Sequence, residues 1–188
     1  MSSVVKIASA LALLAAAAVS AVHSGLVDVA ATSPHWRVTA WILSTTMESS
    51  VRRRASAVRV PDDLDDLARV GRGASAYDEM CAACHAEPGG AAGVLAKGLL
   101  PEPPALADEA EEWSEAEQFW IVKNGVRMTG MPAFGPTHAD DQLWDLVAFL
   151  RKLPSLSPAE YSSLVAGQVE RHSHDHRHRQ TPESREGD

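Results

Sequence analysis

The sequence predicts an all-α protein made of short helices joined by long loops. Apolar residues recur at helical spacing in several segments, and no segment shows the alternation of apolar and polar residues that is typical of strands. Two segments, residues 86–106 and 125–138, are rich in glycine and proline, which interrupt helices. Long loops of this kind are uncommon inside a small compact domain. We therefore expect a large, rigid, apolar ligand to complete the core.

Residues 1–27 have the order of an export signal. Lys6 precedes an apolar run from Ile7 to Val22 that is rich in alanine, leucine and valine. Apolar character continues to Val27, so the segment is also long enough to span a bilayer. We expect an uncleaved signal anchor in the inner membrane that leaves the rest of the chain on the periplasmic side. The alternative is a signal peptide that is cleaved near Ser20 and releases a soluble periplasmic protein.

Residues 33–60 are expected to form an amphipathic helix. Thr32 or Ser33 can cap its start, and Pro34 suits its first turn. One face of this helix would carry Val38, Trp41, Ile42 and Thr45. Arginines near its C-terminal end complement the helix dipole. The helix would lie along the membrane or cover the next domain.

Residues 61–156 are expected to form the folded body of the protein. Its helices are predicted over residues 65–80, 114–124 and 140–153. Ser114 and Glu117 have the spacing of a capping box at the start of the middle helix, and Pro154 stops the last one. The loops between these helices are the two glycine- and proline-rich segments.

The predicted body is acidic. Between Pro61 and Leu153 there are seventeen aspartates and glutamates against seven lysines and arginines, a net charge of −10, and the whole chain carries −8. This balance gives no indication of nucleic-acid binding, which depends on the neutralisation of phosphates. It suits either the docking of a basic protein partner or simple solubility.

The chain has two cysteines, and both lie in the stretch CAACH at residues 81–85. A structural zinc site needs four ligands, a thioredoxin-like dithiol expects a βαβ setting, and a disulfide alone does not explain the adjacent histidine. The pattern C-x-x-C-H is the attachment signature of c-type haem. Cys81 and Cys84 would bond to the haem vinyl groups, and His85 would bind the iron from one side. One such motif predicts one covalently bound haem c.

A second ligand to the iron is expected from a loop on the other side of the ring. Met131 is the candidate, because Gly130 and Pro132 bracket it on a constrained loop. Met128, which lacks that bracket, and His138 are the weaker alternatives. A histidine and methionine pair is a known ligand set that raises the haem potential.

Residues 67–153 resemble the class I c-type cytochrome family, and they are also similar to a subgroup of exported, often membrane-anchored, single-haem cytochromes. Gly73 and Tyr77 match the family's glycine and aromatic residue on the N-terminal helix, and residues 146–150 match its C-terminal helix. The resemblance implies the class I cytochrome c fold, in which these two helices cross at the glycine, here with an extra N-terminal helix. Close packing explains why a glycine stands inside a helix.

The same resemblance implies roles for residues around the haem. The carbonyl of Pro104 would accept a hydrogen bond from the ring of His85 and orient it. Trp120 and Phe134 are expected to line the haem or to pack in the core. With Tyr77, these residues join the two cysteines, His85 and Met131 as the predicted site.

The predicted function is electron transfer outside the cytoplasm, by Fe(III)/Fe(II) cycling at the haem, rather than enzymatic catalysis. An iron with two protein ligands has no vacant position for a substrate, so its haem exchanges electrons with redox protein partners. The alternative is a sensing or catalytic haem in which Met131 is displaced by a small ligand.

Residues 157–188 are polar and are predicted to be a disordered tail. Histidines alternate there with polar residues and could chelate copper, nickel or zinc: His172, His174, His176 and His178. A role in metal handling is therefore a second hypothesis, and incidental metal affinity of a disordered tail is the plainer interpretation.

Overall fold

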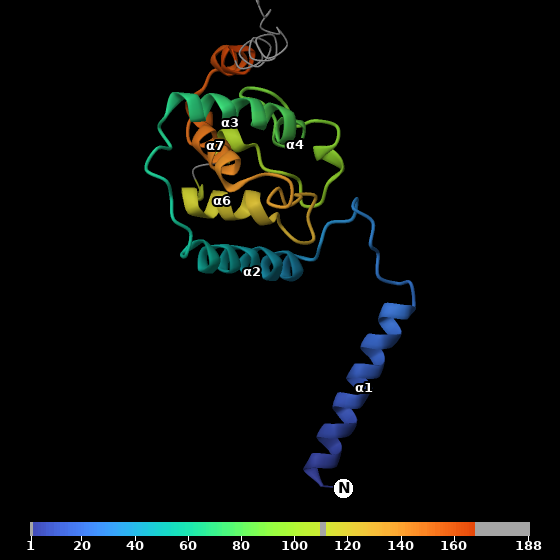
Figure 1. The fold of residues 1–188 in the computed structure, drawn as a ribbon. Coiled ribbons are helices and arrows are strands. Elements are labelled where there is room, and N and C mark those ends of the chain that lie inside the picture. Colours follow the sequence, from blue (N-terminus) through green and yellow to red (C-terminus); the bar gives the residue numbers. More distant parts are fainter. Residues whose placement is uncertain (1, 110–111, 168–188) are drawn as a thin grey trace, which may run out of the picture. The chain divides into compact units, whose positions relative to one another are not determined.

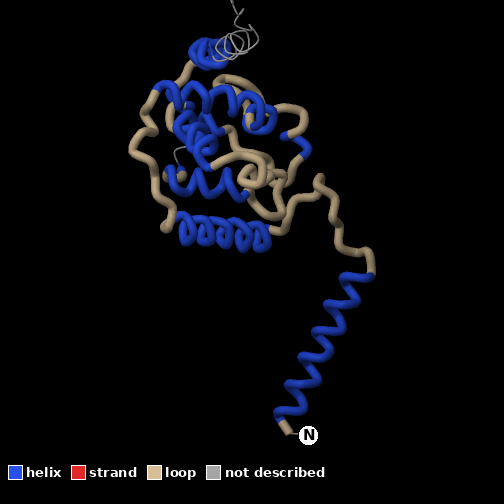
Figure 2. Tube along the Cα trace, viewed as in Figure 1, coloured by secondary structure: helices blue, strands red, loops and turns tan. Residues whose placement is uncertain are grey.

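A computed structural model of the chain describes residues 2–109 and 112–167. Its internal contacts divide the chain into two units, Met1–His35 and Trp36–Asp188, which are described separately. All regular secondary structure in the described residues is helical, and they contain no strand (Figure 2). The predicted all-α fold class is therefore confirmed.

The first unit contains a single long helix, α1, which runs over Ser3–His23 (Figure 1). None of its residues is buried, and the helix is long and apolar enough to cross a membrane. A signal sequence near an N-terminus meets the same criteria. α1 is therefore compatible with both interpretations of residues 1–27.

The longer helices of the second unit include α2 (Arg37–Ala55), α3 (Leu67–Met80), α6 (Glu115–Asn124) and α7 (Asp140–Leu150). Shorter helical turns connect them: α4 (Ala82–His85), α5 (Leu106–Glu109), and two 3₁₀ turns at Ala96–Gly98 and Leu153–Ser155. α3 packs on α7, and α6 packs on both α2 and α7 (Figure 1). The capping box predicted at the start of α6 is present, since the backbone N–H of Ser114 donates to the carboxylate of Glu117 at 2.9 Å.

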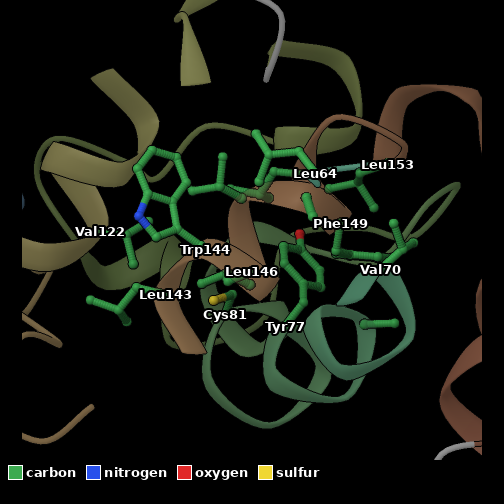
Figure 3. Close-up of a cluster of buried hydrophobic side chains, with 14 of the residues drawn as sticks. Leu64, Val70, Tyr77, Cys81, Val122, Leu143, Trp144, Leu146, Phe149 and Leu153 are labelled. Atoms are coloured by element: carbon green, nitrogen blue, oxygen red, sulfur yellow. The ribbon is translucent and has the colours of Figure 1, made fainter. Parts of the chain in front are cut away.

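α7 supplies most of the core, because every residue from Leu143 to Leu150 is buried. Figure 3 shows side chains of α3 and α6 gathered around it, including Tyr77 and Val122. The ring of Tyr77 lies 5.3 Å from that of Phe149, and Phe119 stacks on Trp144 at 4.1 Å. Each aromatic contact of this kind adds about 0.5–1.5 kcal/mol to the burial of apolar area.

The crossing of α3 and α7 depends on Gly73. A Cβ atom added there would lie only 2.0 Å from the backbone oxygen of Asp145 and 2.8 Å from the Cβ of Phe149. No other residue leaves this space free, so the two backbones approach as closely as the resemblance implied.

Ion pairs link α3 to α7 on one side of the same crossing. Buried Arg69 donates to Asp145 at 2.8 Å, to Asp141 at 2.8 Å and to Asp63 at 3.0 Å. Arg72 donates to the other oxygen of Asp145 at 2.6 Å. Burial lowers the pKa of Arg69, but the hydrogen bonds to Asp141 and Asp63 and the charge of Asp145 outweigh it, so the pKa is raised overall. The arginine therefore stays charged although it is buried.

We predict that Gly73→Ala destabilises the protein by roughly 3 kcal/mol, near the upper end of the cost of overpacking. The new methyl group would collide with the backbone of α7, which cannot move away without separating the helices. Denaturant unfolding followed by circular dichroism measures the effect. Gly98→Ala is the matched control, because nothing lies within 4 Å of an added Cβ there; equal stability of the two variants would contradict the close crossing.

α2 is shorter than the predicted helix over residues 33–60. It begins at Arg37 with Trp36 in the N-cap position, and the hydroxyl of Ser33 instead donates to the side chain of Asp28. Neither Thr32 nor Ser33, the two predicted caps, therefore stands at the N-cap position. The helix ends at Ala55, before residue 60, where the predicted helix ends.

The predicted tail over residues 157–188 begins too early. Residues 158–167 are helical, and Tyr161 in this segment is only 2% exposed and joins the hydrophobic core. Its hydroxyl donates to Asp78 at 2.8 Å. Leu164 and Val165 of the same segment also pack against the core. The boundary was missed because these few apolar residues stand in an otherwise polar stretch. The predicted metal-binding histidines all lie beyond residue 167, outside the described residues.

We predict that stability falls as the pH rises above about 10, the ordinary pKa of an exposed tyrosine. Burial, followed by the hydrogen bond to Asp78, raises the pKa of Tyr161 in the folded state. Unfolding therefore releases a proton above pH 10, and the stabilisation present below that pH is lost. Tyr161→Phe should reduce the slope of unfolding free energy against pH by up to one proton, about 1.4 kcal/mol per pH unit. Denaturant midpoints between pH 8 and 11 measure it, and an unchanged slope would contradict the prediction.

Candidate cofactor site

The second unit contains a cavity of about 250 Å³ with a mostly apolar lining. Cys81, Cys84 and His85 line it from the motif turn, and Met131 lines it from the loop that follows α6. Much of the remaining wall consists of apolar side chains, including Leu99, Pro101, Pro103, Trp113, Ile121 and Val126. The structure thus brings the side chains predicted to attach the haem and to bind its iron to one cavity.

A single helical turn presents the motif residues to this cavity. Cys81 follows the last residue of α3, and its carbonyl accepts hydrogen bonds from the N–H groups of Cys84 at 2.9 Å and His85 at 2.8 Å. The two sulfurs are not joined in a disulfide. Burial, with a smaller contribution from Cys84, raises the pKa of the Cys81 thiol to about 12. The polypeptide alone therefore holds this sulfur as a neutral thiol at the cavity wall.

The ring of His85 is oriented by a backbone carbonyl. Its Nδ1 lies 2.9 Å from the oxygen of Pro104, the contact that the family resemblance implied. Because a carbonyl can only accept, Nδ1 carries the proton, and Nε2 keeps its lone pair for a metal. A hydrogen bond of this kind also makes the imidazole a stronger ligand.

The loop that carries Met131 is held by its own backbone. The N–H of Met131 donates to the hydroxyl of Thr129 at 3.1 Å, and its carbonyl accepts from Val126 at 3.3 Å. Gly125 has φ +64°, and a Cβ there would lie 2.8 Å from the oxygen of Met131. A glycine is required at this position for both reasons.

The two weaker ligand candidates, Met128 and His138, do not line the cavity. Met128 is 73% exposed and is not among the residues that line the cavity. His138 also lies outside the lining, and its Nδ1 is 2.9 Å from the hydroxyl of Thr137. Met131 is the one of the three candidates that faces the cavity.

The remaining predicted site residues divide into two groups. Pro104 and Phe134 line the cavity, whereas Tyr77 and Trp120 do not. Trp120 precedes Ile121 on α6, and one residue turns a helix by about 100°, so its side chain points away from the wall that Ile121 forms. The expectation that Trp120 lines the cofactor is therefore corrected, and Trp113 provides the tryptophan in the wall.

Tyr77 does not line the cavity but stabilises the end of the motif turn. Its buried hydroxyl donates to the carbonyl of Ala86, the residue after His85, at 2.6 Å. Ala86 has φ +62° and ψ 164°, a backbone conformation that residues other than glycine rarely adopt. The tyrosine therefore holds a strained residue that ends the motif turn.

One wall residue comes from outside the predicted body. Met47 lines the cavity from α2, although the body was expected to begin at residue 61. Met47, Val51 and Ala55 recur every four residues along α2, and the latter two are buried. This helical spacing is the sequence signal that could have identified α2 as part of the cavity wall.

The residues present fit a haem group. Two free sulfurs lie one helical turn apart, a histidine nitrogen is available for a metal, and a thioether lines the same apolar cavity. Among the described residues there is no cluster of three or more histidine, cysteine or acidic side chains that could hold a metal ion by itself. The cavity chemistry therefore favours a macrocycle over a bare metal ion.

Comparison with known families agrees with this chemistry. Residues 68–150 match the sequence profile of the family described as "Cytochrome C oxidase, cbb3-type, subunit III". A search of curated proteins found no match. The all-helical fold and the family match support a c-type cytochrome domain in this part of the chain. Such a domain binds haem c covalently and supports haem-based electron transfer.

We predict that Tyr77→Phe lowers stability by about 1–2 kcal/mol, because it leaves the buried carbonyl of Ala86 without its donor. The ring contacts with the core would remain, so the change tests the hydroxyl alone. Denaturant unfolding of the holoprotein measures it. A double variant with Ala86→Gly should recover part of the loss, since glycine adopts this backbone conformation without strain; no recovery would contradict the supporting role.

Proposed function

We propose that this chain is a single-haem electron carrier whose haem is attached through Cys81 and Cys84 and bound at the iron by His85 and Met131. The observation that carries the proposal is that these four side chains line one apolar cavity. The bound haem supplies one-electron cycling between Fe(III) and Fe(II).

The chain's own residues set the conditions for that cycling. Pro104 holds the ring of His85 in one tautomer and orientation through the 2.9 Å hydrogen bond. The backbone bonds of the Met131 loop present the thioether, a ligand type that raises the potential. Apolar wall residues such as Trp113 and Ile121 exclude water, which disfavours the more highly charged oxidised state.

Two protein ligands leave no position open for a substrate, which favours a carrier over an enzyme. The acidic body suits docking with basic surfaces of redox partners. The family description names a subunit of an oxidase, so an oxidase complex is one class of partner.

The proposed location is the periplasmic side of the inner membrane, with α1 as an uncleaved anchor. The length and apolar composition of α1 support this assignment. The alternative is cleavage of the same segment as a signal peptide, which would yield a soluble periplasmic carrier. Membrane fractionation and N-terminal sequencing of the mature protein distinguish the two.

We predict that Met131→Ala abolishes the low-spin His/Met spectrum and lowers the haem potential, because the thioether ligand is lost. The comparison is with Met128→Ala, three residues earlier on the same loop, where the side chain is 73% exposed. Redox titration and absorption spectra of the two holoproteins measure the effect. Intact mass confirms that haem remains covalently attached in both.

Two results would contradict the assignment. A Met131→Ala protein with an unchanged spectrum and potential would remove Met131 as the ligand. Binding of carbon monoxide to the native reduced protein would show that the methionine is readily displaced, and would favour the sensing or catalytic alternative instead.

A further inference from the structure

The N-terminal half of α2 exposes large apolar side chains that the second unit does not bury. The exposed fractions are 85% for Trp36, 67% for Val38, 65% for Trp41 and 49% for Ile42. The C-terminal half differs, because Val51 and Ala55 are buried where α2 packs alongside α6 at the edge of the unit (Figure 1). One helix thus has a packed half and an unpartnered apolar half.

The exposed residues are not a continuation of the packed face. At 100° per residue, Met47, Val51 and Ala55 point in one common direction, and Val38, Trp41 and Ile42 are centred about 130° away. The exposed group is therefore a second apolar face of α2, which no element of the described second unit covers. An exposed apolar patch of this kind marks an interaction surface.

The charge around this second face fits a lipid surface. Residues 29–47 contain no aspartate or glutamate and one arginine, Arg37, whereas residues 61–153 carry a net charge of −10. An anionic bilayer would repel the acidic body and would not repel this segment. Tryptophan is also enriched in membrane proteins at the level of the lipid headgroups.

The length of the chain between α1 and α2 keeps the second face near a membrane. Thirteen residues separate His23, the end of α1, from Arg37, the start of α2, and they can extend over at most about 45 Å. When α1 crosses the bilayer, as proposed above, α2 stays within that reach of its surface at all times. A weak affinity for lipid is sufficient under such tethering.

We propose that the N-terminal half of α2 lies in the headgroup region of the bilayer, with Val38, Trp41 and Ile42 facing the acyl chains. Met47, which lines the haem cavity, follows Ile42 by five residues, or about 7.5 Å along the helix. The membrane contact would therefore hold the cavity close to the bilayer surface. Redox complexes embedded in that membrane would meet the haem domain there.

The test uses the full-length holoprotein in liposomes of phosphatidylethanolamine and phosphatidylglycerol. Its native cysteines are consumed by haem attachment, so a single introduced cysteine can be labelled with the fluorophore NBD. Val38→Cys reports on the proposed lipid face. Ser44→Cys is the matched control, since Ser44 is also exposed and lies about 120° around the same helix.

We expect aqueous dithionite to bleach the label at Val38 roughly threefold more slowly than the label at Ser44, because acyl chains shield it. Lipids that carry a nitroxide on the acyl chain should quench the Val38 label more strongly. Equal bleaching of both labels in protein that floats with the liposomes would overturn the lipid contact while α1 still stands as an anchor.

Two further results are decisive. Protein that fails to float with the liposomes would overturn both the anchor and the lipid contact, without bearing on the haem chemistry. Protection of the Val38 label without nitroxide quenching, together with cross-linking between introduced cysteines of two chains, would assign the face to a second copy of the protein and overturn the proposal.

Discussion

The close crossing of α3 and α7 at Gly73 is the constraint on which the cofactor site depends. α3 ends at Met80 and the motif turn follows at once, so the position of α3 on α7 determines where Cys81 points. The charged cluster around Arg69 and Asp145 stabilises the same crossing from the side. Breaking such a buried pair by removing one partner leaves an uncompensated charge, at a typical cost of about 3–5 kcal/mol. The close contact at Gly73 and the ion pairs therefore restrict the position of α3 on α7.

The rest of the site is the cavity that the packing of α3 on α7 does not fill with side chains. α7 buries a continuous row of side chains, yet the loops on the cavity side contribute prolines and glycines and little core of their own. Loops of this kind can wall an apolar cavity only if each loop is fixed by hydrogen bonds of its own. The bonds from His85 to Pro104 and from Met131 to Thr129 do this on the two segments proposed to supply the iron ligands. The loops that are long for a small domain thus form walls of the cavity.

How much could be predicted from the sequence depends on how local each signal is. The motif at Cys81, the capping box at Ser114 and the glycine and proline that flank Met131 are local patterns. The structure forms the capping box and places the motif and Met131 in the lining of one cavity. Tyr161 and Met47 act through contacts with residues far away along the chain. The spacing of Met47, Val51 and Ala55 indicates a packed face of α2, but it does not say which part of the chain that face meets. The prediction for Trp120 was wrong for a related reason. The sequence shows that α6 contains a tryptophan, but which residues of α6 line the cavity depends on how the helix is rotated about its axis.

α2 shows how segments outside a family-defined core can change what that core does. The family match covers residues 68–150, and α2 lies wholly before it, yet Met47 is part of the cavity wall. The same helix has an exposed apolar face that its own domain does not bury. A rigid helix that contacts the cavity with one half and a bilayer with the other would set the distance between the haem and the membrane. Because electron exchange requires close approach of the cofactors, such a helix would select membrane-embedded partners without any change in the haem ligands.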